Sequence, residues 1–245
     1  MKLVALIPAR WASTRFPGKP LALIKGRPMV EHVYRRALAI PEVDEVHIAT
    51  DSPEIEKAVL AFRGRAVLTR PEHPSGSDRL AEAADILKLA DEDIVLNIQG
   101  DQPAFDPDQP ALLARALKEE PGLEMATLAI PLSNARDIHN PGHVKVAFGK
   151  DNFALYFSRA PIPWPRDGEG EYYRHIGIYA YRAAFLRRFV TLPEGRLERL
   201  ERLEQLRALE NGTRIKIIVV SGLSPEVDVP ADIAAAEEAL CRESH

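Results

Sequence analysis

Apolar residues in the first half of the chain follow two alternating patterns, short continuous runs and longer stretches with helical spacing. The short runs predict buried strands. The stretch from Pro28 to Ala39 has the helical pattern, because Val30, Val33 and Ala37 lie three and four positions apart. Strands that alternate with helices predict βαβ units, and therefore an α/β fold with a mostly parallel sheet.

The order of elements follows from these patterns. We predict strands over 3–8, 45–50, 66–69 and 94–98, and helices over 28–39, 53–62 and 78–90. In the second half, loops with Pro and Asn separate strand-like runs at 125–130, 144–148 and 176–181, which indicates a small mixed or antiparallel subdomain. Helices over 183–189 and 196–209, a strand over 215–220 and a helix from near Pro230 follow. We expect one domain, 1–245, with this subdomain at approximately 131–190.

Composition and charge narrow the class of protein. Hydrophobic residues make up 46% and charged residues 28% of the chain, which is typical of a globular protein. The formal net charge of −4 argues against general affinity for nucleic acid. No apolar run is long enough to span a membrane, and the apolar start meets Arg10 too early for a signal peptide. With a single cysteine, Cys241, these features predict a cytoplasmic protein without membrane or nucleic-acid partners.

Cations gather in the segment that follows the first predicted strand. Between Pro8 and Lys19 the chain carries Arg10, Arg15 and the small residue Gly18. Open α/β sheets bind ligands beyond the carboxyl ends of their strands, so charged side chains and backbone N–H groups are placed to surround a polyphosphate. The spacing matches neither a Walker A loop nor the dinucleotide-binding glycine pattern. The alternative is a solvated basic loop with a Pro-Gly turn.

A second loop, from Arg70 to Arg79, lies at the same predicted edge of the sheet. Hydroxyl and backbone groups at Ser75 and Gly76 suit a base or a ribose, and Arg79 suits an anionic substrate. The alternative is an ordinary turn that leads into a helix cap at Ser77.

Acidic residues supply the third feature. Asp101 follows the strand over 94–98 directly, in the sequence Gln99-Gly100-Asp101. Mg²⁺ keeps several waters and needs only one or two protein carboxylates, so Asp101 is placed to hold Mg²⁺ on bound phosphates. Asp228 is our candidate for a second carboxylate. The alternatives are a turn aspartate at Asp101 and a helix N-cap at Asp228.

Six longer runs are more specific than any of these loops. In order, the chain contains IPARWASTRFPGKPL, LNIQGD, HNPGHVKV, ALYFSRAPIPW, RHIGIY and LEQLR. They resemble the 3-deoxy-manno-octulosonate cytidylyltransferase (CMP-Kdo synthetase) family over nearly the whole chain. The resemblance implies a GT-A-like nucleotidyltransferase sheet flanked by helices and a homodimer with contacts through the smaller subdomain. It also implies a Mg²⁺-dependent transfer of CMP from CTP to the anomeric hydroxyl of 3-deoxy-D-manno-octulosonate (Kdo), with release of pyrophosphate, for lipopolysaccharide biosynthesis.

The resemblance assigns residues as well. It implies nucleotide binding by Pro8, Ala9, Arg10, Arg15, Lys19, Arg70, Ser75 and Gly76, and metal binding by Asp101 and Asp228. It implies catalytic roles for Lys19, Arg10, Asp101 and Asp228, with Lys19 neutralising charge as the α-phosphate is attacked. It implies sugar binding by Arg79, Gln99, Arg159, His175, Tyr179, Glu204 and Gln205. Asn140 and Lys145 also match the family, although the sequence gives them no separate role.

The sugar-side residue types suit a polyhydroxylated carboxylate, with arginine for the carboxylate and the other side chains for hydroxyls. Each also has a structural alternative. Tyr179 fits a core position, His175 a surface histidine and Arg159 a surface anchor at a strand end. Glu204 and Gln205 fit the solvated face of an arginine-rich helix.

Two other functions stay open at this point. A cytidylyltransferase for another ulosonic acid would share the chemistry, and a non-catalytic nucleotide-binding protein would share the fold. A GT-A glycosyltransferase is disfavoured, because Gln99-Gly100-Asp101 offers only one acid of an Asp-x-Asp pair. The short insertion between Trp164 and Arg174 and the segment from Ser221 to Glu226 depart from the family, and they leave the identity of the sugar acid open more than the chemistry.

Overall fold

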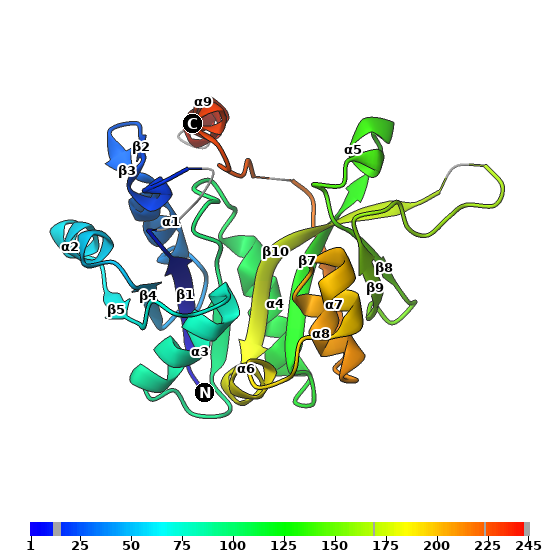
Figure 1. Ribbon diagram of the computed structural model, residues 1–245, viewed down its shortest axis with the longest axis horizontal. Helices are drawn as coiled ribbons and strands as arrows, with labels where there is room; N and C mark the ends of the chain where they lie inside the picture. Colours follow the sequence, from blue (N-terminus) through cyan, green and yellow to red (C-terminus); the bar gives the residue numbers. More distant parts are fainter. Residues whose placement is uncertain (12–15, 169, 223, 243–245) are drawn as a thin grey trace.

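The computed structural model describes residues 1–11, 16–168, 170–222 and 224–242 (Figure 1). Its strands are β1 (Leu3–Ala9), β2 (Leu23–Ile24), β3 (Arg27–Pro28), β4 (Glu45–Thr50), β5 (Ala66–Leu68), β6 (Ile94–Asn97), β7 (Met125–Leu132), β8 (Lys145–Phe148), β9 (Ala154–Ser158), β10 (Tyr172–Arg182) and β11 (Ile215–Val219). Its α-helices are α1 (Met29–Ala37), α2 (Pro53–Ala61), α3 (Gly76–Ile86), α4 (Asp108–Glu119), α5 (Ala135–His139), α6 (Ala183–Phe189), α7 (Arg196–Glu201), α8 (Gln205–Glu210) and α9 (Ile233–Arg242). Two 3₁₀ turns are η1 (Lys19–Leu21) and η2 (Pro230–Asp232).

A nine-stranded sheet runs through the described part of the chain. Its order is β11-β7-β10-β6-β1-β4-β5, with β8 attached to β10 and β9 attached to β8. β1 is parallel to β4 and β6, β4 is parallel to β5, and β11 is parallel to β7. Only β10 runs antiparallel to both of its neighbours in that order, β6 and β7. The mostly parallel α/β sheet predicted from the sequence is therefore confirmed.

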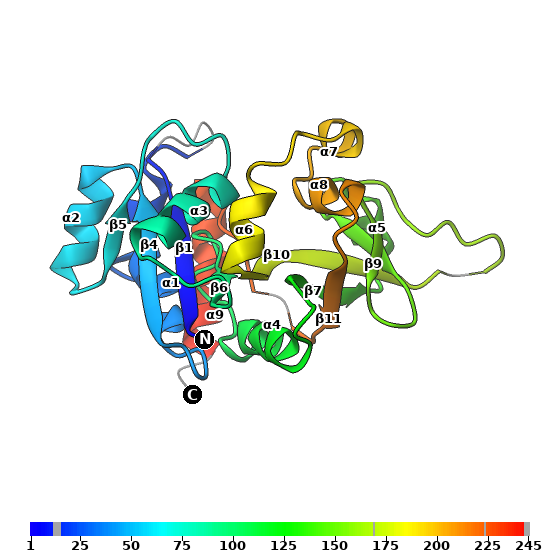
Figure 2. The same ribbon diagram turned by 90° about the horizontal axis from the view of Figure 1, so that it is seen from below.

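The sheet has helices on both faces, and β1 is buried between them. Ala5 and Ile7 pack into a core with α1, α2 and α4, whereas Val4 and Leu6 pack into a core with α3, α6 and α8. Figure 2 shows α4 on one side of the strands and α3 and α6 on the other. Burial on both faces explains why β1 is a continuous apolar run rather than an alternating one. Because β1 is packed on both faces, the loop that follows it begins at a fixed position.

The helices depart from the sequence prediction in four places, one of which is the short α5, where only a loop was expected. α3 begins at Gly76 and ends at Ile86, not 78–90, because Ser75 caps it by accepting a hydrogen bond from the Asp78 backbone. α4 is a helix that the sequence pattern did not predict. The single helix predicted over 196–209 is two helices, α7 and α8, because Arg202 adopts a left-handed conformation with φ of 55°.

The second half of the chain completes the central sheet as well as extending it. β7 and β10 pair along most of their length, and β10 also pairs with β6, so both belong to the central sheet. β8 and β9 form an antiparallel pair beyond it, on the side away from α2 in Figure 1. Within the described residues, no helix is both long enough and apolar enough to cross a membrane.

Candidate active site

The three loops singled out in the sequence meet in one cavity at the carboxyl ends of β1 and β6. The cavity has a volume of about 300 Å³. Ten of the predicted site residues line it: Pro8, Ala9, Arg10, Lys19, Ser75, Gly76, Arg79, Gln99, Asp101 and Asp228. The other described residues of the lining are Pro20, Met29, His73, Pro74 and Gly100. Arg15 lies outside the described residues.

Lys19 is the central cation of this cavity. Its Nζ lies 2.8 Å from Oδ2 of Asp101 and 3.3 Å from Oδ1 of Asp228. The Lys19 side chain is only 14% exposed, so water screens these ion pairs less than it would at the surface. Two carboxylates from distant parts of the chain therefore converge on one point beside the loop that follows β1.

Local backbone contacts fix the two carboxylates. The Val227 N–H donates to the Asp101 carbonyl over 2.9 Å, which joins the segment before η2 to the loop after β6. The backbone N–H groups of Asp228 and Val229 donate to Oδ2 of Asp232, at 2.8 and 2.9 Å. Asp232 therefore binds the backbone N–H groups of this turn, while the Asp228 carboxylate turns toward Lys19. The helix-cap alternative for Asp228 does not hold.

A glycine allows the loops after β1 and β6 to approach each other. A Cβ atom added to Gly100 would lie 2.9 Å from the carbonyl oxygen of Pro8, a backbone atom that cannot swing away. The two loops could not keep this separation with any side chain at position 100. Gly100 therefore brings Asp101 close to the loop that carries Lys19.

We expect Gly100→Ala to destabilise the protein by about 1–3 kcal/mol, the usual cost of forcing extra volume into a packed site. The change should also lower turnover, because Asp101 must move with its neighbour. Urea unfolding at neutral pH measures the first effect. Gly122→Ala is the matched control, because an added Cβ there meets nothing within 4 Å. An unchanged unfolding midpoint for Gly100→Ala would contradict the close-approach argument.

A further ion pair lies beside the two aspartates and was missed in the sequence. Arg174 Nη2 lies 3.2 Å from Oε1 of Glu226, and Gln102 Nε2 donates to the same oxygen over 3.3 Å. Burial raises the pKa of Glu226, Arg174 opposes that shift, and Asp101 and Asp228 add to it. Three carboxylates therefore lie near one another beside the cavity, where Lys19 pairs with Asp101 and Asp228 and Arg174 pairs with Glu226.

The loop before α3 and the first turn of that helix line the cavity with Ser75, Gly76 and Arg79, as expected, but not with Arg70. Arg79 is 3% exposed and its guanidinium binds Thr69 Oγ1 at 2.6 Å and Asp51 Oδ2 at 2.9 Å, so it is held rigidly in the wall. Arg70 is exposed and binds Glu82 instead of lining the cavity. His73, which also contacts Glu82, does line it. Only its position between two predicted residues could have suggested His73 from the sequence.

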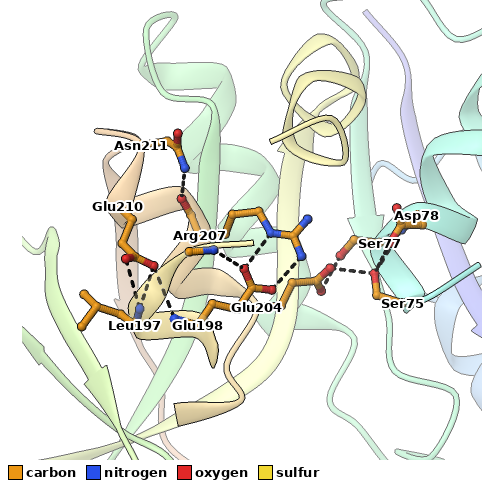
Figure 3. Close-up of polar contacts among 10 residues, drawn as sticks. Ser75, Ser77, Asp78, Leu197, Glu198, Glu204, Arg207, Glu210 and Asn211 are labelled. Carbon is orange, nitrogen blue, oxygen red and sulfur yellow. Dashed lines mark hydrogen bonds and ion pairs between the residues drawn. The ribbon is translucent and has the colours of Figure 1, made fainter. Parts of the chain in front are cut away.

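Glu204 connects the sugar-side residues to this loop. Its carboxylate accepts hydrogen bonds from Ser75 Oγ at 2.6 Å and Ser77 Oγ at 2.9 Å (Figure 3). Burial is the largest influence on its pKa and raises it, although both serines act in the opposite direction. Glu204 also lines a second cavity of about 560 Å³, which shares Pro74 and Ser75 with the first. Glu204 is thus a partly buried contact between distant segments and not part of a solvated helix face.

His175 lies on β10 as a buried ring, and Tyr179 lies on the same strand partly buried. His175 Nε2 is 3.0 Å from Thr127 Oγ1, and its ring packs edge-on to Phe157 and against Tyr179. Burial raises the pKa of Tyr179 well above its usual value. Burial also lowers the pKa of His175 to about 3, and the charge of Arg174 acts in the same direction. His175 is therefore a neutral imidazole at physiological pH.

The pKa of His175 predicts a loss of stability in acid. An unfolded histidine titrates near pH 6.5, so below that pH the unfolded chain binds a proton that the native chain does not accept until about pH 3. The native state is then destabilised as the pH falls from 6.5, by about 2 kcal/mol at pH 5. Urea unfolding at pH 7.5 and pH 5 should show this loss in the wild type and not in His175→Gln. Equal pH dependence in both proteins would contradict the prediction.

Of the remaining predicted residues, Gln99 and Arg159 donate to backbone carbonyls, whereas the amide nitrogen of Gln205 does not find an acceptor among the described residues. Gln99 Nε2 donates to the Gly177 carbonyl over 2.8 Å, where the β10–β7 register shifts. Arg159 donates to the carbonyls of Glu201 and Pro141. Gln205 is 5% exposed, and its Nε2 has no hydrogen-bond partner among the described residues. An unsatisfied buried amide is costly, which makes Gln205 a candidate for a contact with a bound ligand.

The arrangement combines one half suited to an anion and another suited to hydroxyl groups. Lys19 and Arg10 with the backbone of residues 8–10 and 75–76 form the first, beside two carboxylates. Glu204 lines the second cavity, which adjoins the first at Pro74 and Ser75, and its carboxylate can accept hydrogen bonds from hydroxyl groups there. Such a site can hold a phosphorylated ligand next to a polyhydroxylated one.

Comparison with known proteins agrees with this description. The profile of the cytidylyltransferase family matches residues 4–216. A 3-deoxy-manno-octulosonate cytidylyltransferase from Syntrophus aciditrophicus is 50% identical over 241 residues, 98% of this chain and 97% of that protein. An 8-amino-3,8-dideoxy-manno-octulosonate cytidylyltransferase from Shewanella frigidimarina is 48% identical over 239 residues, 97% of this chain and 98% of that protein.

Solved structures of cytidylyltransferases also match this chain. A structure of CMP:2-keto-3-deoxy-manno-octonic acid synthetase complexed with CTP matches with a TM-score of 0.94 and 43% identity, covering 99% of this chain and all of that one. A 4-diphosphocytidyl-2C-methyl-D-erythritol synthase, at 17% identity and a TM-score of 0.65, covers 98% of each chain and shares the fold. The chain therefore belongs to the cytidylyltransferase family of nucleotidyltransferases, in the group that contains the octulosonate enzymes.

Proposed function

We propose that the protein transfers CMP from CTP to the anomeric hydroxyl of Kdo, giving CMP-Kdo and pyrophosphate. The observation that carries the proposal is the cavity in which Lys19 joins Asp101 and Asp228 beside the loop after β1. Relatives with half of their residues identical are named for this sugar, and the matching synthetase structure holds CTP. In the reaction the sugar oxygen bonds to the α-phosphorus, the bond from that phosphorus to the β-phosphate oxygen breaks, and the hydroxyl proton leaves.

The donor set fits Mg²⁺. Asp101 and Asp228 both contact one ammonium group, which means that both carboxylates reach a single cation position. Among the described residues no third His, Cys, Asp or Glu joins them as a ligand group, which suits a hard cation that takes its other ligands from water and phosphate. When bound, Mg²⁺ would neutralise phosphate charge and lower the pKa of the attacking hydroxyl.

The chain's own groups supply positioning and charge. Lys19 and Arg10 balance the negative charge of the phosphates, and the backbone N–H groups of residues 75–76 hold the nucleotide. Arg79, fixed by Asp51, keeps the wall of the cavity rigid. The sugar hydroxyls meet His175, Tyr179, Glu204 and Gln205. Phosphoryl-type transfer asks little more of a protein than this, because orientation and charge stabilisation lower most of the barrier.

Pyrophosphate release tests the proposal. The assay contains CTP and Mg²⁺ with Kdo, with 8-amino-3,8-dideoxy-manno-octulosonate, with a sialic acid, or without sugar. We expect release with Kdo and none without sugar. Release with only one of the other acids would move the substrate to that ulosonic acid. CTP binding without release in any mixture would favour a nucleotide-binding protein.

The proposal includes a homodimer in the cytoplasm, with contacts through the subdomain at approximately 131–190, which supplies CMP-Kdo for lipopolysaccharide biosynthesis. Trp164 is 82% exposed and Leu155 69% exposed in that subdomain, and large apolar side chains in such positions suit a surface that a second copy covers. Light scattering behind size exclusion, with Trp164→Ser as the comparison, tests the oligomeric state. A monomeric wild type would end this part of the proposal.

A further inference from the structure

Lys145 is a fully buried lysine whose side chain donates hydrogen bonds to three carbonyl oxygens. It is 0% exposed. Its Nζ donates to the main-chain carbonyls of Asn140 at 3.0 Å, His143 at 2.6 Å and Arg159 at 2.5 Å. All three ammonium protons are therefore used. Burial is the main reason that the pKa of Lys145 is lowered, because the charged form loses its hydration in the interior.

Arg159 extends these contacts to the corner between α7 and α8. Its Nε donates to the Glu201 carbonyl over 2.8 Å and its Nη1 to the Pro141 carbonyl over 3.0 Å. Its backbone N–H donates to the Glu201 carboxylate over 2.9 Å. Lys145 and Arg159 thus hold the turn at 140–143 from two sides, and Arg159 joins that turn to the corner.

The corner sets the position of Glu204. Arg202, with its left-handed backbone, ends α7 and redirects the chain, so that Glu204 lies at the start of α8. From there Glu204 reaches Ser75 and Ser77 at the edge of the nucleotide cavity (Figure 3). A continuous series of contacts therefore runs from Lys145 through Arg159 and the corner to the loop before α3.

We propose that Lys145 is a positioning residue for the acidic-sugar half of the site. It acts through Arg159 and the α7–α8 corner, and it places Glu204 and Gln205 for the sugar hydroxyls. A neutral side chain of the same volume would pack as well and avoid the cost of burying a cation, but it could not hold three carbonyls in one arrangement. This inference rests on the proposed function, because it assigns the corner to sugar binding.

Lys145→Met tests the proposal, since methionine keeps a similar volume and loses the charge. We expect the KM for Kdo to rise about tenfold or more, while the KM for CTP stays within about twofold. Lys150→Met is the matched control, because Lys150 is exposed in the turn between β8 and β9. An unchanged KM for Kdo in folded Lys145→Met, or an equal rise for both substrates, would overturn the proposal.

Chemical rescue shows whether the effect of Lys145→Met comes from loss of the ammonium group or from altered packing. Cys241 is the chain's single cysteine, so Lys145→Cys in a Cys241→Ser background carries one thiol. Aminoethylation of that thiol in denaturant, followed by refolding, restores an ammonium at nearly the original length. The KM for Kdo should return toward the wild-type value, and a failure to return in refolded protein would count against the proposal.

A measurement without substrate tests the role of Lys145 independently of the proposed function. Hydrogen exchange at 196–207 should be faster in Lys145→Met than in Lys150→Met, because the corner loses its support. Unchanged exchange there would overturn the positioning role even if Kdo is the substrate. If exchange is faster in Lys145→Met but the wild type does not turn over Kdo, Lys145 still supports the α7–α8 corner, and the proposed function is wrong.

Discussion

Asp101→Asn should lower the rate of pyrophosphate release about a thousandfold, because the variant loses one of the two carboxylates proposed to hold Mg²⁺ on the reacting phosphate. Asp228→Asn should behave in the same way, since both aspartates approach the same Lys19 ammonium. Asparagine keeps the shape of each side chain. Steady-state kinetics across a range of Mg²⁺ concentrations measures the effect.

Both variants should remain folded. The Asp101 and Asp228 side chains are 31% and 43% exposed, so each ion pair with Lys19 adds less than about 1 kcal/mol of stability. Asp108→Asn serves as the control, because Asp108 is an exposed residue in the first turn of α4. Wild-type turnover in either site variant would remove that aspartate from the proposed metal site, and thermal unfolding would show whether a loss of turnover is only a loss of fold.

The nucleotide half of the site was predictable because it depends on a general property of parallel sheets. The loops after β1 and β6 and the loop before α3 lie at one edge once the strand order is known, so charged residues there must meet. Asp101 and Lys19 could therefore be chosen from the sequence and lie 2.8 Å apart. Asp228 was less certain, because only the long-range contact between Val227 and Asp101 brings it to the same place.

The sugar half was less accessible, because tertiary contacts override local pattern there. The residues 196–209 have helical spacing throughout, yet the chain turns at Arg202, where contacts from Arg159 and Ser158 bind Glu201. A pattern of exposed charges could not show that Glu204 binds two serines from a distant loop. Family resemblance could point to Lys145, but its role depends on three carbonyls whose positions no sequence pattern predicts.

Replacing Lys19 should have two opposite effects: turnover should fall, and binding of a divalent cation should become tighter. Lys19→Met should lower turnover about a thousandfold, because the phosphate charge is no longer balanced by an ammonium in a cavity where water screens charge only weakly. The same change removes the cation that now occupies both carboxylates. A divalent ion no longer has to compete with Lys19, so binding of Mn²⁺ to the nucleotide-free protein should become tighter.

Paramagnetic titration with Mn²⁺ and pyrophosphate release measure the two parts in one preparation. Lys57→Met, an exposed position on α2, is the matched control and should change neither. Without a divalent ion, the melting temperature of Lys19→Met should fall, because Asp101 and Asp228 then repel each other, and it should recover as Mn²⁺ is added. If Mn²⁺ bound more weakly to Lys19→Met than to the wild type, the two carboxylates would not form the cation site, whatever happens to turnover.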